Sequence, residues 1–254
     1  MMMESALTRF SKTWLLFFFI SSMVATLFQE QIQSHNLEQA LKFGFDPFGR
    51  NCILLSLNAA IGSMVAIIPL GALCLGSTLL LSTLCLIKNE TFRFLWNTLW
   101  EAFYTLPGFI IAISLTAFFP TTTLTFPFAV LFLLIPYLIR FFEGQIQSLL
   151  KKEYVDQAIA LGATPFHLFR FHILPELFQA SKAILPFLIT RLLIIETTLT
   201  FVGMKQPSET SSWGDLLYLG KDYLLEAPWI SFFTALPLFL TLFSFHLLSK
   251  NEHS

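Results

Sequence analysis

Charged side chains are scarce in this sequence. Of its 254 residues, 12% are Asp, Glu, Lys or Arg, compared with roughly 25% in ordinary soluble domains. Hydrophobic residues make up 55%, 30 residues are Phe, and the mean hydropathy is +0.70. A soluble domain of this size could not cover so much apolar surface with so few charges, and a disordered chain would be far less hydrophobic. The remaining class is an integral membrane protein built from helices.

Cysteine is also rare, and the three residues Cys52, Cys74 and Cys85 lie in or beside apolar stretches without metal-ligand spacing. The net charge of −1 gives no indication of a nucleic-acid partner. The five histidines form no His-x-x-x-His or Glu-x-x-His pair, and no Gly-x-Ser-x-Gly turn occurs. We therefore expect no catalytic residue, cofactor or bound metal, and an intramembrane enzyme is the disfavoured alternative.

Six stretches can cross a membrane when the chain is divided at prolines and polar clusters. A helix needs ~20 apolar residues to cross a hydrocarbon core of ~30 Å. In chain order, the expected spans are Trp14–Phe28, Gly62–Ile87, Leu99–Phe119, Leu124–Phe142, Ala183–Met204 and Trp229–Ser249. An interfacial helix over Gly49–Ala60 should precede the second span. The sequence thus predicts an all-α polytopic membrane protein, with an anchor helix and outer loop over residues 1–48 and a core domain over residues 49–254.

The first stretch, Trp14–Phe28, is short for a span and follows Arg9 and Lys12, a pattern that secretory signal peptides share. No small-x-small cleavage site follows it, because Gln29-Glu30-Gln31 ends the apolar run. We therefore interpret it as a retained anchor helix.

Basic residues are distributed unevenly over the two sides of this frame. With the N-terminus inside, the inner segments hold ten of the 15 basic residues: Arg9, Lys12, Lys88, Arg93, Arg140, Lys151, Lys152, Arg170, Lys182 and Lys250. The outer loops hold Lys42, Arg50, Lys205 and Lys221. Because cytoplasmic loops carry the excess of Lys and Arg, both termini are expected in the cytoplasm.

The one long inner segment, residues 143–182, has the pattern of two short helices joined by a corner. Four apolar residues recur at helical spacing and form one stripe: Leu150, Tyr154, Ala158 and Leu161. Gly162 supplies a helix stop, and Thr164-Pro165 fits an N-cap followed by proline at the first helical position. Pro175 should close the second helix before the next span. Such a segment is shaped to dock on a cytoplasmic partner, and the alternative is a helix pair lying on the membrane.

The same segment resembles a known motif. Residues 153–163 read EYVDQAIALGA, and His172–Pro175 reads HILP. They are similar to the "EAA" loop of ABC-importer permeases, in particular the subfamily for di- and oligopeptides or nickel, whose version reads close to EYVEAARALGA…RHILPN. This sequence departs from that pattern at Gln157, Ile159 and Glu176.

Further stretches resemble the same family in the family's order. Residues 43–50 (FGFDPFGR) are similar to LGTDELGRD, and residues 196–203 (ETTLTFVG) are similar to EASLSFLGLG. Residues 212–215 (SWGD) and 220–229 (GKDYLLEAPW) resemble SWG and GRDYLLSAPW, which indicates the second, C-type member of the permease pair. The resemblance covers roughly residues 43–248. The family's C-terminal tail has no counterpart in this sequence, so a non-transporting scaffold is an alternative.

This resemblance implies the fold of a type I importer permease and a division of labour among subunits. The chain would form the translocation path as a heterodimer with a second permease, in the lipid of a bacterial inner membrane. Two cytoplasmic ATPase subunits would hydrolyse ATP, and an extracytoplasmic (periplasmic) substrate-binding protein would deliver the cargo. Peptides are the expected cargo, with nickel or another small solute as the alternative. A secondary transporter or channel is disfavoured, since no inverted repeat is visible.

The resemblance also implies roles for individual residues. The ATPase-coupling loop, about residues 143–182, would act through Glu153, Asp156, Ala158, Gly162, Ala163, Pro165 and Pro175. Glu101 matches an acidic position of the family and should be structural. The outer segment from Lys205 to Pro228 should contact the binding protein or the partner permease, and Trp213 and Trp229 should anchor it at the membrane interface.

Arg191 and Glu196 lie within the fifth expected span, where a charge costs ~2.5–3.5 kcal/mol and therefore faces protein or water. Arg191 stands where the family has a small apolar residue. At ~100° per residue, five positions separate the two side chains by ~140° around the helix, so a direct pair is not expected. Each side chain should either form hydrogen bonds with another helix at the dimer interface or face the translocation pathway. In the pathway, Arg191 would bind a substrate carboxylate.

Overall fold

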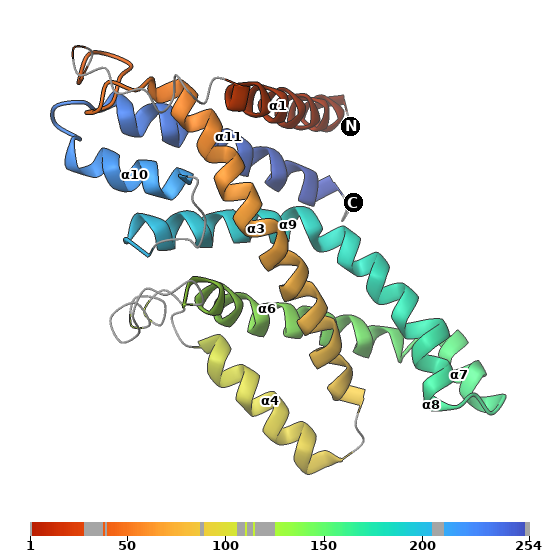
Figure 1. Ribbon diagram of the computed structural model, residues 1–254. Coiled ribbons are helices and arrows are strands. Elements are labelled where there is room, and N and C mark those ends of the chain that lie inside the picture. The colour runs from red at the N-terminus through yellow and green to blue at the C-terminus, as the bar shows by residue number, and fades with distance from the viewer. Residues whose placement is uncertain are drawn as a thin grey trace.

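The structure is a computed structural model, and its described part consists mainly of helices (Figure 1). It describes residues 2–27, 38, 40–86, 89–105, 110, 114, 125–204 and 211–251. The long helices are α1 (Met2–Leu27), α3 (Cys52–Ser82), α6 (Thr125–Leu149), α9 (Leu174–Phe201) and α11 (Trp229–Asn251). The shorter elements are η2 (Thr83–Leu86), α4 (Glu90–Thr105), α7 (Glu153–Ala160), α8 (Pro165–Leu168), the π-helix η3 (Phe169–Ile173) and α10 (Trp213–Asp222).

Within the described residues, four helical stretches are long and apolar enough to cross a membrane: Cys52–Leu86, Phe126–Leu149, Phe169–Phe201 and Trp229–Lys250. They contain the whole of the sixth predicted span and most of the second, the fourth and the fifth. The first predicted span falls in α1, which is not among these four stretches. Of the third, Leu99–Phe119, the structure describes residues 99–105, 110 and 114. The predicted total of six spans is therefore not confirmed.

The separate interfacial helix predicted over Gly49–Ala60 is wrong, because α3 begins at Cys52 and continues through this region into the second span. Asn51 caps the helix, and its side chain accepts hydrogen bonds from the backbone nitrogens of Ile53 and Leu54. The physical reason is that a single glycine such as Gly62 weakens a helix without ending it, and α3 even continues past Pro69, whose missing N–H removes one intrahelical hydrogen bond.

Helix α3 lies at the centre of the bundle and packs against α1, α6, α9, α10 and α11. Its buried face is rich in small residues such as Ala59, Gly62 and Ser63, which let the backbones of neighbouring helices approach closely. A Cβ atom at Gly71 would lie 3.0 Å from Leu192 Cδ1 of α9. A larger residue at position 71 would therefore require the Leu192 side chain to shift where α3 crosses α9.

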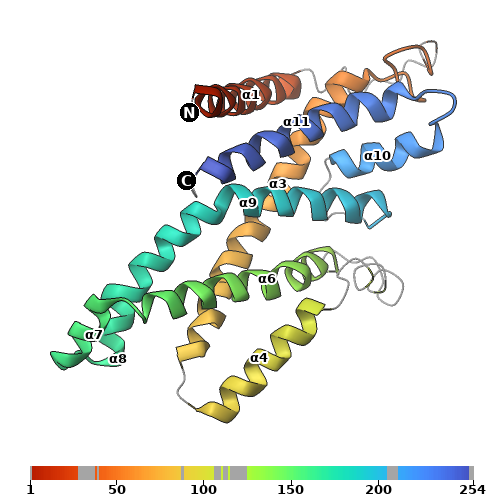
Figure 2. The same cartoon turned by 180° about the vertical axis from the view of Figure 1, so that it is seen from behind.

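The ends of the elements gather on two opposite sides of the molecule. In both views the start of α1 and the end of α11 lie on the same side as α7 and α8, and α10 lies on the other side (Figures 1 and 2).

Helices α1 and α3 expose large apolar side chains. Among them are Leu16, Phe17, Ile68 and Leu80, each with more than half of its surface accessible. Such faces suit a lipid or a protein partner rather than water.

Candidate functional site

Residues 150–173, here named the projection, follow α6 and precede α9 at one end of the molecule (Figure 1). Its first helix, α7, follows Lys152, whose backbone is extended with ψ 138°. The first turn carries Glu153 and Asp156, both exposed. Negative charges are favourable there because the amide dipoles point their positive ends toward a helix N-terminus.

The corner of the projection is a glycine turn, as predicted. Gly162 has φ +86°, a left-handed conformation that side chains disfavour. The backbone nitrogen of Gly162 donates to the oxygen of Ile159 at 2.9 Å, and that of Ala163 donates to the oxygen of Ala158 at 3.0 Å. This pair of bonds is the Schellman motif, which satisfies the last carbonyls of α7 and turns the chain. Ala158 and Ala163 are both half-buried.

The second helix of the projection also begins as predicted. Pro165 is the first residue of α8, and Thr164 Oγ1 accepts a hydrogen bond from the backbone nitrogen of His167 at 3.3 Å. The prediction that Pro175 closes this helix is wrong, because α8, η3 and α9 follow one another without a gap. Pro175 is exposed and lies in the first turn of α9, where its missing N–H is tolerated.

Two of the four residues of the predicted apolar stripe, Tyr154 and Leu161, are exposed, while Leu150 and Ala158 are half-buried. Leu161 is 90% exposed and Tyr154 is 38% exposed, and the neighbouring Ile159 is 52% exposed. The side chain that holds α7 to the body is Val155, which is 1% exposed. Apolar side chains concentrated at the tip of a small structure indicate a surface that a partner covers.

Polar contacts join the base of the projection to α9. Lys152 Nζ lies 3.6 Å from Glu176 Oε1, and it also lies 5.7 Å from the centre of the Tyr154 ring. Glu176, one of the departures from the family pattern, therefore pairs with Lys152. Because both groups are about half exposed, this ion pair orients the projection more than it stabilises it.

On the opposite side of the molecule, Glu196 of α9 is fully buried. It forms side-chain hydrogen bonds with Ser63 of α3, with Ser212 and with Thr197, the last at 3.2 Å. The backbone nitrogen of Trp213 donates to Ser63 Oγ at 3.2 Å. We name Glu196, Ser63, Ser212 and Trp213 the Glu196 cluster. It joins α3, α9 and the start of α10. Of the two roles predicted for Glu196, contact with other helices is the one observed within this chain.

The prediction that Trp213 is a membrane-interface anchor is wrong. Its side chain is fully buried, and its indole nitrogen donates to the backbone oxygen of Ser56 at 3.0 Å. Beside it, a Cβ atom at Gly214 would lie 1.6 Å from Thr200 Oγ1 and 2.7 Å from the backbone oxygen of Thr197. Only glycine fits here, so the SWGD and ETTLTFVG stretches are two halves of one contact. The sequence pattern singled out both stretches but not their association.

The FGFDPFGR stretch forms a tight turn before α3. Asp46 is fully buried, accepts hydrogen bonds from the backbone nitrogens of Phe48 and Arg50, and pairs with the Arg50 guanidinium at 2.6 Å. The Trp229 indole nitrogen, at the start of α11, donates to the backbone oxygen of Phe45 at 3.0 Å. The FGFDPFGR stretch is thus tied to the GKDYLLEAPW stretch, which ends at Trp229, on the side of the molecule that carries α10.

The remaining predicted residues lie apart from these groups. Arg191 is exposed on α9, with its guanidinium carbon 5.0 Å from the centre of the Phe187 ring and 5.8 Å from that of Tyr137 on α6. Glu101 of α4 forms an ion pair with Arg140 of α6 at 2.7 Å. The expected absence of a direct Arg191–Glu196 pair agrees with their positions, exposed and buried, on α9.

Comparison with known proteins identifies the family. The family model described as binding-protein-dependent transport system inner membrane component matches residues 68–251, which include the projection and the Glu196 cluster apart from Ser63. The chain belongs to this family. It is therefore the permease component of a membrane transport system rather than an enzyme.

Three relatives of this permease are named for the transport of peptides, oligopeptides or glutathione. It is 26% identical over 227 residues to a Brucella suis protein named as a peptide transport system permease, which covers 88% of this chain and 75% of the relative. Over 109 residues, 43% of this chain and 35% of the relative, it is 34% identical to the oligopeptide transport system permease protein OppC of Haemophilus influenzae. It is 25% identical over 213 residues to the glutathione transport system permease protein GsiD of Escherichia coli, covering 81% of this chain and 68% of that protein.

Proposed function

We propose that this permease forms the translocation path of an ATP-driven importer for di- or oligopeptides, and that its projection docks on a cytoplasmic ATPase subunit. The relatives are named for peptides, oligopeptides and glutathione, which are all peptide cargoes. The single observation that carries the docking proposal is the exposed apolar tip of the projection, with Leu161 90% exposed. A groove on a soluble ATPase would cover that tip.

The geometry supports a mechanical coupling between this docking surface and the membrane. The helical run from Pro165 to Glu196 has no gap, so ~45 Å of continuous helix, which includes η3 and Pro186, connects the corner of the projection to the Glu196 cluster. ATP-driven closure of the ATPase subunits would displace the projection, and the displacement would reach α3 and α10 through that cluster. This is a rigid-body transition of packed helices rather than local unfolding.

The proposal includes the subunits that the family's scheme requires. These are a second permease, two cytoplasmic ATPase subunits and an extracytoplasmic binding protein that faces the α10 side. Both termini and the projection would lie in the cytoplasm, with the permease in the bacterial inner membrane. Arg191 would face the second permease or the translocation path, because an exposed guanidinium within a span requires protein or water beside it.

Replacing an apolar side chain at the tip tests the docking proposal. Leu161→Asp should abolish most of the ATPase binding, because a carboxylate would be buried in an apolar groove. Tagged wild-type and variant permeases are purified from their own bacterium, and the copurifying subunits, the ATP hydrolysis and the uptake of a labelled tripeptide are measured.

The matched control is Leu225→Asp, since Leu225 is 98% exposed and follows α10 on the opposite side of the molecule. This variant should keep its ATPase subunits. Retention of full ATP hydrolysis and uptake by Leu161→Asp would show that the projection is not the docking surface.

A further inference from the structure

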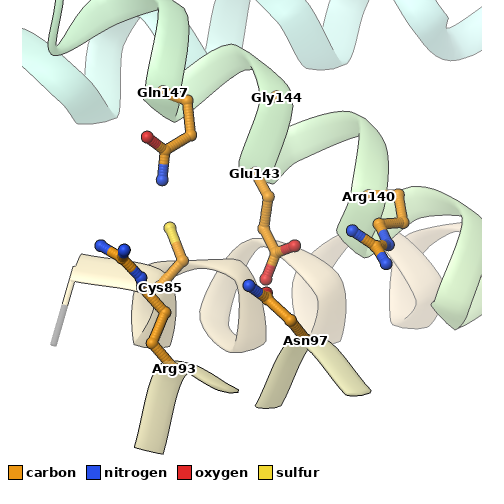
Figure 3. Close-up of a pocket in the computed structure, with 7 residues that line it drawn as sticks. All are labelled: Cys85, Arg93, Asn97, Arg140, Glu143, Gly144 and Gln147. Carbon is orange, nitrogen blue, oxygen red and sulfur yellow. The ribbon is translucent and has the colours of Figure 1, made fainter. Parts of the chain in front are cut away.

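A polar pocket of about 390 Å³ lies where α4 meets η2 and the second half of α6. Its lining residues are Cys85, Arg93, Asn97, Arg140, Glu143, Gly144 and Gln147. In Figure 3 the side chains of α6 point toward those of α4 across the open space. Because α6 leads directly into the projection, the pocket lies near that end of the membrane-spanning bundle.

The charged groups that line the pocket are two guanidiniums and one buried carboxylate. Glu143 is 7% exposed and accepts a hydrogen bond from the Trp96 indole nitrogen at 2.5 Å. Arg140 pairs with Glu101. Arg93 is exposed and forms no ion pair within 4.0 Å in the part of the chain that the structure describes. The pocket therefore offers one guanidinium without an ion pair in the described chain, with the amides of Asn97 and Gln147 beside it, while the Glu143 carboxylate in its wall is held by the Trp96 indole.

We propose that this pocket binds the phosphate group of a membrane phospholipid. A guanidinium presents paired N–H donors that match two phosphate oxygens, and the two amides add further donors. Arg140 keeps donors free because a guanidinium carries five N–H groups and the ion pair with Glu101 does not use all of them. Basic pockets between helices near the cytoplasmic surface are a known form of lipid headgroup site.

The surroundings favour a lipid over a free anion. Phe94, Leu95 and Leu99 of α4 are 69%, 61% and 47% exposed, respectively. At ~100° per residue, Phe94 lies beside Arg93 around α4, whereas Leu95 and Leu99 lie on the far face of the helix. An amphiphile with its phosphate in the pocket could therefore place an acyl chain against Phe94. Inorganic phosphate would gain nothing from this apolar side chain.

The bound lipid would hold α4 to the bundle. In the described structure α4 packs mainly on α6, and its polar contacts with that helix include Trp96 to Glu143 and Glu101 to Arg140. A phosphate between Arg93 on one wall and Gln147 on the other would add a bridge between the same two helices. Lipid binding should therefore raise the thermal stability of the permease.

The test uses the full-length permease purified in detergent. Phosphatidylglycerol is added in increasing amounts, and bound lipid is measured by native mass spectrometry together with the midpoint of thermal unfolding. Arg93→Gln should weaken binding about five-fold, the effect that corresponds to ~1 kcal/mol for one basic side chain near an anionic lipid surface. Because Arg93 is exposed and has no ion pair in the described chain, this variant should fold normally.

Arg9→Gln is the matched control, since Arg9 is an exposed arginine near the start of α1 on the same side of the molecule. It should bind lipid as the wild type does. Gln147→Ala provides a second pocket variant and should also bind less. Equal weakening by Arg9→Gln would mean diffuse surface binding, and full stabilisation by inorganic phosphate alone would mean a free-anion site. Displacement of the lipid by a cargo peptide would assign the pocket to the translocation path. Each of these three results would overturn the proposal.

Discussion

At the scale of single residues, glycines of this permease differ sharply in what they tolerate. Gly162 has open space for a side chain but a left-handed backbone, whereas at Gly214 the backbone of Thr197 and the side chain of Thr200 fill the space that a Cβ atom would need. Gly76 of α3 has neither restriction. The same substitution should therefore cause backbone strain at Gly162, cause steric overlap at Gly214 and be neutral at Gly76.

Gly162→Val should leave membrane insertion intact but uncouple ATP hydrolysis from transport. A β-branched residue in the left-handed conformation costs ~1–2 kcal/mol, so the Schellman turn would open and the apolar tip would lose its fixed direction. Uptake of a labelled peptide should fall at least ten-fold at equal membrane levels, while Gly76→Val stays near the wild type. Normal transport by Gly162→Val would contradict a coupling role for this corner.

At the scale of elements, the association of α10 with α9 is the contact that sequence patterns could not supply. Ser212 caps α10 through a box with Asp215, in which Ser212 Oγ accepts from the Asp215 backbone nitrogen at 3.2 Å. The same serine also reaches Glu196. The serine that caps α10 thus also contacts α9. The spacing of residues along the chain cannot reveal this second contact.

Gly214→Val should undock α10 from α9 and destabilise the permease by about 3 kcal/mol, the upper part of the usual range for overpacking. Thermal unfolding of the purified protein in detergent, compared with Gly76→Val, measures this effect. An unchanged unfolding midpoint would show that α10 does not depend on this close approach. Unlike Gly162→Val, this variant should lose protein level and transport together.

The continuous helix from the projection into α9 is a second result at this scale. Sequence reasoning placed a break at Pro175, because proline usually ends a helix. The structure starts α9 at Leu174, so the proline falls in the first turn, after the π-helix η3. The boundary of a span and the continuity of its connection to the projection are therefore properties of the folded chain.

At the scale of the whole molecule, the sidedness of the permease can be tested with thiols. Cys52, Cys74 and Cys85 are all buried, so an introduced cysteine should be the main reactive one. A membrane-impermeant maleimide applied to intact spheroplasts should label Leu225→Cys and spare Ala160→Cys, which should react only after lysis. Labelling of Ala160→Cys from outside would place the projection on the wrong side for an ATPase.

The amino-acid sequence by itself determined the membrane class, the approximate positions of four long apolar helices, and the glycine turn and threonine cap of the projection. These properties follow from hydrophobic runs, from a capping threonine and from one glycine, which act over a few neighbouring residues. Only the tertiary structure decided that Trp213 is buried beside Ser63, that Glu196 joins three helices and that Arg93 lacks an ion pair within the described chain. Those facts depend on side chains distant in sequence, whose contacts exist only once the helices have packed.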